Sequence, residues 1–263
     1  MEGALMQTLL VELTDGVQVI TLNRPDRYNA FNEEMKKALR EALKAAARDA
    51  AVRCLVIRGA GDKAFCSGQD LKEYRGEGFS LKESLERDYN PIILSIRTME
   101  KPVVGMINGV AAGAGCSLAL ACDMRFMAST ATLIEVFVRI GLVADSGSHW
   151  FLPRLVGAAR AFEYAATGRD IGAEEALAVG LVNRVTPPDR LEAETMEAAR
   201  KLAQGPTRAI GLIKRTFNRA LSTDLEALLQ YEARMQEIAS KTADHQEGLR
   251  AFREKREAKF TGS

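Results

Sequence analysis

The stretch that decides the fold runs from Lys101 to Leu120 and reads KPVVGMINGVAAGAGCSLAL. Its apolar start, Val103–Ile107, predicts a buried strand, and the apolar run at its end predicts a helix. Between them, Gly109, Gly113 and Gly115 allow tight or positive-φ turns and leave backbone N–H groups open to a ligand. The first turn of a helix also presents unpaired N–H donors and a positive dipole end. This turn can therefore bind a phosphate or hold a developing oxyanion.

The composition predicts a soluble, folded chain without nucleic-acid or membrane partners. Its 263 residues suffice for one large domain, or for a domain with a helical appendage. A net charge of +1 lacks the basic excess that nucleic acids or anionic membranes require. Val103–Ile107 is too short to cross a bilayer, and the start of the chain lacks the features of a signal peptide. We therefore expect a cytoplasmic protein.

The cysteines and histidines predict no metal site. The four cysteines lack a CxxC spacing, so we expect reduced and mostly buried thiols. Only two histidines, His149 and His245, are present, which excludes a His-rich metal site.

The pattern of apolar residues predicts an α/β core followed by helices. Strands are expected at 8–13, 17–22, 53–58, 103–107, 123–128 and 182–185, with a hairpin turn at 14–16 and a loop at 59–69. Helices are expected at 32–48, 81–99, 116–122, 147–155, 160–167, 173–178, 191–202, 206–221, 224–240 and 245–255, with Asn32 as an N-cap. The alternation of strands and helices indicates βαβ units. We divide the chain into a core, 1–200, and a helical C-terminal region, 201–263. The helices of this region either form oligomer contacts or present a solvent-exposed face.

A second glycine loop, Lys63–Leu71 (KAFCSGQDL), follows the predicted strand at 53–58. Gly68 permits a strained turn that frees the N–H of Gln69. Taken alone, each glycine stretch also fits an ordinary connection between a strand and a helix. Both follow predicted parallel strands, however, and open α/β sheets bind ligands at the carboxyl ends of such strands. Two backbone donors from adjacent loops would form an oxyanion hole.

These motifs resemble the crotonase (enoyl-CoA hydratase/isomerase) superfamily over essentially the whole chain. Further similar motifs are LNRP (22–25), IGLVADSG (140–147), TGR (167–169), ALAVGLV (176–182) and EGLRAFREKR (247–256). The resemblance implies a spiral of ββα repeats with a C-terminal helical trimerisation region, assembled as a homotrimer or a dimer of trimers. It also implies an acyl-CoA thioester substrate, with coenzyme A as part of the substrate and no separate cofactor.

The resemblance assigns the backbone N–H groups of Gln69 and Ala114 to the thioester oxygen, where they would stabilise an enolate. It places Arg24 and Arg27 near the CoA nucleotide, although exposed arginines are often merely solvated. It places Lys255 and Phe260 near the adenine and phosphate end, often of a neighbouring subunit. The substrate-binding residues implied are Arg24, Arg27, Ala64, Cys66, Gly68, Asp70, Leu71, Gly113, Gly115, Ser117, Phe137, Lys255 and Phe260.

The two glutamate positions that hydratases of this family use are Ser117 and Phe137 here. Adding water to a double bond needs a base for the water and an acid for the carbon, so a simple hydratase is disfavoured. Glu135 is nearby, and on a strand it would share a face with Phe137, which makes it a weak substitute.

Asp145, in the Gly-Leu-x-x-Asp pattern of 141–145, is the remaining carboxylate. The pattern resembles family members that shift double bonds or isomerise rings, most of all the phenylacetate-pathway ring-epoxide isomerase group. One carboxylate can take a proton from one carbon and return it to another, and Phe137 as an apolar wall would raise its pKa. By pattern alone, Asp145 could instead cap a helix starting near Ser146. His149 is interpreted as pocket wall or surface.

We therefore expect an acyl-CoA isomerase in which Asp145 is the proton shuttle, with an enoyl-CoA hydratase using some other water-binding group as the alternative. Two other classes compete. A dinucleotide enzyme would need a third glycine at Leu118. The near-zero net charge argues against an RNA-associated relative. The presence of Asp145 argues against a relative that binds acyl-CoA without catalysis.

Overall fold

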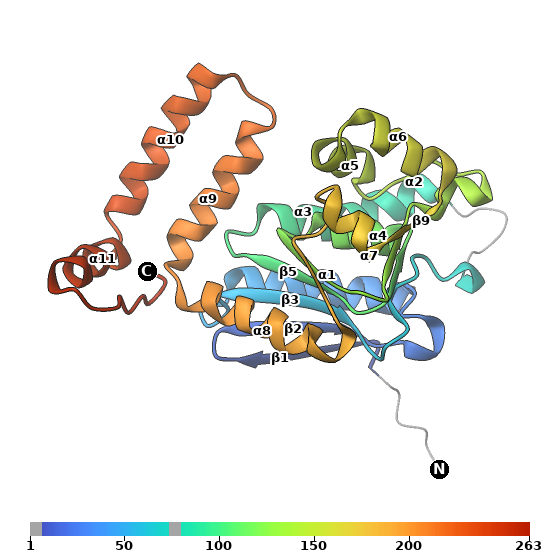
Figure 1. Cartoon of the computed structure of the whole chain (residues 1–263), viewed down its shortest axis with the longest axis horizontal. Helices are drawn as coiled ribbons and strands as arrows, with labels where there is room; N and C mark the ends of the chain where they lie inside the picture. Colours follow the sequence, from blue (N-terminus) through green and yellow to red (C-terminus); the bar gives the residue numbers. More distant parts are fainter. Residues whose placement is uncertain (1–6, 74–79) are drawn as a thin grey trace, which may run out of the picture.

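The computed structural model describes residues 7–73 and 80–263 and shows two sheets with helices around them (Figure 1). The larger sheet has the strand order β1-β2-β3-β5-β7-β10. β1 and β2 form the expected antiparallel hairpin, and the other neighbours in this sheet are parallel. Its strands are β1 (Leu9–Thr14), β2 (Val17–Leu22), β3 (Cys54–Gly59), β5 (Val103–Ile107), β7 (Met124–Ala128) and β10 (Arg184–Thr186).

A second sheet, with the order β4-β6-β8-β9, is absent from the sequence-based expectation. Its strands are β4 (Ala64–Cys66), β6 (Val110–Ala112), β8 (Thr132–Ile134) and β9 (Asp170–Gly172). β3, β5 and β7 of the larger sheet each lead into a short strand of the second sheet and then into helical structure. This repetition confirms the predicted crotonase-like ββα spiral. The glycine loops therefore follow β4 and β6, and the expectation that no further strand separates them from 53–58 and 103–107 is wrong.

The helices largely match their predicted positions. The Asn32 side chain accepts a hydrogen bond from Met35 N at 2.8 Å and caps the first long helix, as predicted. The predicted helix at 81–99 is interrupted by a π-helical segment, Leu85–Tyr89. The α-helices are α1 (Glu33–Arg48), α2 (Leu81–Ser84), α3 (Asn90–Thr98), α4 (Ala114–Ala121), α5 (Ser148–Val156), α6 (Ala158–Thr167), α7 (Ala173–Ala178), α8 (Pro188–Gln204), α9 (Thr207–Ala220), α10 (Leu225–Ser240) and α11 (Ala243–Glu254).

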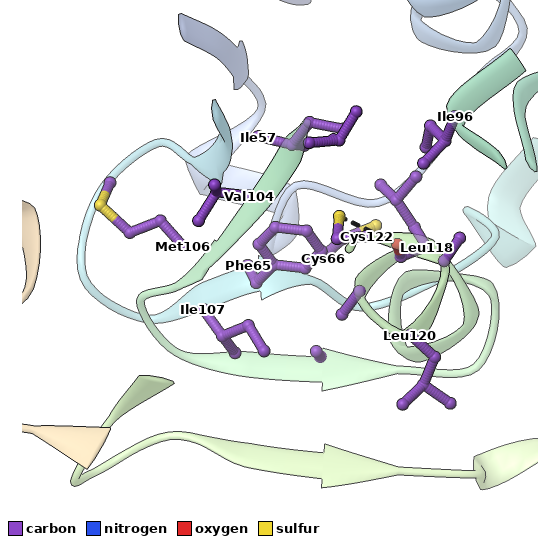
Figure 2. Close-up of a cluster of buried hydrophobic side chains, with 14 of the residues drawn as sticks. Ile57, Phe65, Cys66, Ile96, Val104, Met106, Ile107, Leu118, Leu120 and Cys122 are labelled. Atoms are coloured by element: carbon purple, nitrogen blue, oxygen red, sulfur yellow. Dashed lines mark hydrogen bonds between the residues drawn. The ribbon is translucent and has the colours of Figure 1, made fainter. Parts of the chain in front are cut away.

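Buried side chains from both sheets and α4 form the core beneath the glycine loops. Figure 2 shows Phe65 and Cys66 of β4 gathered with Val104 of β5 and with Leu118 and Cys122 at α4. All four cysteines of the chain are buried and free, as expected. Burial raises the pKa of the Cys66 thiol to about 12, so it stays protonated and packs as a small apolar group. The core thus fixes the start of α4 against β4.

The C-terminal helices α9, α10 and α11 extend to one side of the sheets (Figure 1). α9 is anchored by Lys214, whose buried Nζ lies 2.7 Å from Asp123 Oδ2. α8 packs against β3, β5 and β7 and ends at Gln204, so residue 200, which we chose as the end of the core, lies within this helix. Among the described residues, none of the helices combines the length and apolar character needed to cross a membrane.

Candidate active site

The two glycine loops meet in space and leave two backbone donors free. Gly68 has φ +92° and Gly113 has φ +53°, conformations that favour glycine. A Cβ atom added to Gly68 would lie 3.4 Å from Ala114 N, so the loops are in contact. Within residues 7–73 and 80–263, the N–H groups of Gln69 and Ala114 donate no hydrogen bond. Ala114 also begins α4, whose positive dipole end adds to the attraction for an anionic oxygen.

Gly115 and Gly109 are explained by close backbone contacts. A Cβ atom on Gly115 would lie 2.1 Å from Cys66 O, and one on Gly109 would lie 2.4 Å from Lys63 O. Both distances are far below van der Waals contact with a backbone atom that cannot easily move. The glycine spacing of this stretch therefore serves the contact of α4 and β6 with the β4 loop.

A cavity of about 280 Å³ lies at these loops. Its walls are mostly apolar, and Asp145 is the single carboxylate among the described residues that line it. Within the described lining, Tyr89 is the other titratable side chain. The lining residues are Ser67, Gly68, Gln69, Leu71, Leu81, Ser84, Leu85, Tyr89, Ala112, Gly113, Ala114, Val136, Phe137, Ile140, Leu142 and Asp145.

The Asp145 carboxyl is half-buried, and burial raises its pKa above the ordinary value of aspartate. A hydrogen bond from Ser146 Oγ to Asp145 Oδ1, 2.8 Å long, and the charge of His149 act in the opposite direction. Ser146 has φ +50° and Gly147 has φ +89°, so the chain turns sharply after the aspartate. Gly147 is the N-cap residue of α5, and no side chain caps this helix. The capping interpretation of Asp145 is therefore wrong.

Gln69 is held by side chains that the sequence analysis missed. Its Oε1 accepts hydrogen bonds from the Tyr89 hydroxyl and from Lys36 Nζ, the latter at 3.3 Å. Lys36 is buried beside Asp88, whose carboxyl also accepts from Arg40 at 3.1 Å. Burial raises the pKa of Tyr89 well above that of free tyrosine. No sequence motif marks Lys36 and Tyr89, because they are far from Gln69 in the sequence and reach it only through the packing of α1 and the π-helical segment.

The structure brings together only part of the predicted site. Lining the cavity are Gly68, Gln69, Leu71, Gly113, Ala114, Phe137 and Asp145. Outside its lining are Arg24, Arg27, Ala64, Cys66, Asp70, Gly115, Ser117, Lys255 and Phe260. No group of acidic, histidine or cysteine side chains among the described residues is arranged to hold a metal ion.

Several residues outside the lining have evident structural roles. Arg24 Nη2 lies 2.9 Å from Asp70 Oδ2 and fixes the loop after Gln69. Partial burial opposes the ionisation of Asp70, but hydrogen bonds from Arg24 and from the backbone of Lys72 give it a lowered pKa. Phe260 lies beside the start of β3, where its carbonyl accepts from Arg53 Nη1 at 3.1 Å. A contribution of Phe260 to the site of a neighbouring subunit stays a prediction.

Glu135 and Ser117 lie behind the cavity. Both are fully buried. A 3-10 helix begins at Val136, so the strand alternation that would place Glu135 and Phe137 on one face does not apply, and that expectation is wrong. Phe137 lines the cavity, whereas Glu135 accepts a hydrogen bond from Ser148 Oγ at 3.0 Å.

Comparisons with known proteins agree with this architecture. The family profile described as enoyl-CoA hydratase/isomerase matches residues 12–263. The chain is 41% identical to the 1,2-epoxyphenylacetyl-CoA isomerase of Escherichia coli, over 98% of this chain and 100% of that protein. It is 43% identical to a probable enoyl-CoA hydratase of Rhodobacter capsulatus, over 97% and 98%. The crystal structure of an enoyl-CoA hydratase from Bacillus anthracis has a TM-score of 0.92 at 35% identity, covering 98% of this chain and 100% of that one.

Proposed function

This chain belongs to the enoyl-CoA hydratase/isomerase family, and we propose that it is an acyl-CoA isomerase in which Asp145 carries the proton. One observation carries the proposal: Asp145 is the single carboxylate among the described residues that line the cavity. An isomerase returns the same proton at another carbon, so it needs only one acid–base group.

The proposed reaction uses the two backbone donors and the carboxylate that line the cavity. Asp145 removes a proton from a carbon next to the thioester carbonyl, and the C–H electron pair moves into an enolate. The N–H groups of Gln69 and Ala114 hold the enolate oxygen. Protonated Asp145 then returns the proton to a carbon further along the chain, and the double bond shifts. The raised pKa of Asp145 brings the carboxyl closer to the pKa of the carbon acid and aids both transfers.

A hydratase is the alternative, since the Rhodobacter capsulatus relative carries that name. It would need a second acid–base group to activate water. Among the lining residues that the structure describes, Tyr89 is the remaining titratable side chain, and its raised pKa keeps the phenol protonated. The Escherichia coli relative is named for the isomerisation of an epoxide on an aromatic-ring acyl-CoA. This reaction can use the same enolate chemistry, so ring-epoxide acyl-CoA thioesters are a candidate substrate class.

The test compares the wild type with Asp145→Asn on a 3-enoyl-CoA, on 1,2-epoxyphenylacetyl-CoA and on crotonyl-CoA. We expect the wild type to isomerise one or both of the first two, and the variant to lose about 10²- to 10⁴-fold in kcat. Asp189→Asn, at an exposed position in α8, is the matched control and should keep full activity. Unchanged turnover by Asp145→Asn, or rapid hydration of crotonyl-CoA by the wild type, would overturn the proposal.

We also propose that the chain assembles as a homotrimer or a dimer of trimers in the cytoplasm, with the acyl-CoA as its ligand and no separate cofactor. Exposed apolar side chains on α9 and α10, among them Phe217, Leu225 and Leu229, support an interface there. Light scattering of the purified protein decides the oligomeric state, and a monomeric mass would contradict this assembly.

A further inference from the structure

A chain of buried hydroxyl groups connects a buried carboxyl to the backbone of Asp145. Ser148 Oγ lies 3.0 Å from Glu135 Oε1 and 2.8 Å from Ser117 Oγ. Ser117 Oγ in turn lies 3.0 Å from the Asp145 carbonyl oxygen and 3.2 Å from that of Gly113. The three side chains of this relay, Glu135, Ser148 and Ser117, are fully buried and do not line the cavity. The relay therefore contacts the backbone of the proposed proton shuttle and of the oxyanion turn without touching substrate.

We propose that Glu135 is a positioning residue, which acts through Ser148 and Ser117 on Asp145 and switches with its own protonation. This inference rests on the proposed role of Asp145. It differs from the interpretation of Glu135 as a substitute catalytic acid, because the carboxyl has no access to the cavity.

Counting hydrogens shows how the switch works. When Glu135 is protonated on Oε1, the bond to Ser148 reverses: Glu135 donates to Ser148, Ser148 donates to Ser117, and Ser117 donates to the carbonyl of Asp145 or Gly113. When Glu135 is ionised, Ser148 must donate to the carboxylate. The hydrogen of Ser117 is then needed between the two Oγ atoms, since two oxygens 2.8 Å apart repel each other without a hydrogen between them. The carbonyl groups consequently lose their bond from Ser117.

The surroundings of Glu135 favour the protonated form. Its second oxygen, Oε2, has no hydrogen-bond partner within the described part of the chain, which is costly for a buried charge. Burial raises the pKa of Glu135 to about 7, and the negative charge of Asp145 acts in the same direction. Ser148 and the Cys116 thiol on α4 favour the ionised form and oppose this shift. The pKa of Cys116 is itself raised, chiefly by burial and then by Glu135. The positive charge of Arg125 on β7 opposes this shift without cancelling it.

The switch predicts a pH effect with a definite sign. As the pH rises through about 7, Glu135 ionises, Ser117 releases the carbonyl groups, and kcat falls. The loss corresponds to one hydrogen bond from the Ser117 hydroxyl to a backbone carbonyl, or about fivefold in kcat. In Glu135→Gln the side-chain NH₂ donates to Ser148 at every pH. This variant should match the wild type at pH 6 and keep its kcat at pH 8, where the wild type has lost activity.

The experiment measures the pH profiles of kcat for the wild type, Glu135→Gln and Asp145→Asn, using the isomerase substrate. His149→Gln serves as a control, because this exposed histidine on α5 is the neighbouring side chain whose charge acts on Asp145. Infrared spectroscopy adds a readout that is independent of turnover: the carbonyl band of a protonated carboxyl should disappear from the wild type between pH 6 and 8 and be absent from Glu135→Gln.

The outcomes separate the two proposals. If Asp145→Asn is inactive but the profiles of Glu135→Gln and the wild type superimpose, the relay is refuted and the proposed function stands. If Asp145→Asn stays active, the proposed function fails instead. Loss of the same pH limb in His149→Gln, with Glu135→Gln unchanged, assigns that limb to the histidine and overturns the relay.

Discussion

The close contact between α4 and the β4 loop allows a sharp prediction for Gly115→Ala. The added Cβ would lie 2.1 Å from Cys66 O, 2.7 Å from Cys66 C and 2.8 Å from Cys66 Cβ. To reach an ordinary contact of about 3.4 Å, the two backbones must separate by about 1 Å. Gln69 is three residues beyond Cys66, and Ala114 directly precedes Gly115, so the separation would pull apart the N–H groups of these two residues, the proposed oxyanion donors.

Two effects of opposite sign compete in this variant. Alanine is a better helix former than glycine, which would stabilise α4 by about 1 kcal/mol. Overpacking against a rigid backbone costs about 1–3 kcal/mol or more. Because all three contacts involve the backbone or Cβ of a buried strand residue, we expect the steric cost to exceed the gain in helix propensity. The free energy of unfolding should fall by about 1–2 kcal/mol net. Displaced donors should lower kcat by about 10²-fold, in the range seen when one oxyanion-hole donor is removed.

The assay combines urea unfolding with kcat on the isomerase substrate. Gly172→Ala is the matched control, since Gly172 has φ −72° and a Cβ added there meets nothing within 4 Å. It should change the free energy of unfolding by less than about 1 kcal/mol and leave kcat unchanged. If Gly115→Ala were as stable as the wild type and fully active, the argument that this glycine sets the spacing of the two loops would be refuted.

Three further predictions concern other residues around the site. Asn29→Ala should lower the free energy of unfolding by about 3 kcal/mol in urea, because the fully buried Asn29 side chain bonds three backbone groups; a loss under about 1 kcal/mol would contradict this. Phe137→Glu, which adds a second carboxylate to the cavity, should raise the hydration rate of crotonyl-CoA at least about tenfold over the wild type, and no gain would count against the two-carboxylate requirement. For Glu135, a folded-state pKa of about 7 against an ordinary 4.5 means that the native state holds a proton that the unfolded state releases, so stability falls with rising pH. Relative to Glu135→Gln, the wild type should lose about 2–3 kcal/mol between pH 5 and pH 8 in urea unfolding, and a constant difference would contradict the raised pKa.

The loops of the site could be predicted from the sequence because they depend on glycine. Gly68 and Gly113 adopt positive φ, and Gly115 lies where a Cβ would clash with the neighbouring backbone. Such positions leave a mark in the sequence whatever the rest of the fold does. The predicted donors Gln69 and Ala114 accordingly face one cavity, together with Asp145 and Phe137.

The short strands of the second sheet could not be predicted, since three residues carry no measurable alternation. β4 consists of Ala64–Cys66, buried throughout, and it reads as part of a loop. For the same reason, the prediction that Glu135 and Phe137 share one face of a strand was wrong. Glu135 lies between the end of β8 and a 3-10 helix that begins at Val136. Tyr89 was missed because its approach to Gln69 depends on the packing of a π-helical segment against α1. These contacts are set by tertiary structure, and single-sequence patterns do not contain them.

Ser117 occupies a position where the resemblance implies a glutamate in hydratases, and it belongs to the relay that leads to the buried Glu135. A glutamate at this position would bring a second acid–base group toward the substrate, as the family resemblance implies for hydratases. The serine hydroxyl instead lies behind the cavity, 2.8 Å from Ser148 Oγ and 3.0 Å from the carbonyl oxygen of Asp145. The fully buried Glu135 at the far end of the relay does not line the cavity, so it acts on Asp145 through the hydrogen bonds of the relay and through its charge. With a hydroxyl at the position where the resemblance implies a carboxylate in hydratases, the proposed isomerase relies on Asp145 as its proton carrier, and the proposed relay makes the position of Asp145 depend on Glu135.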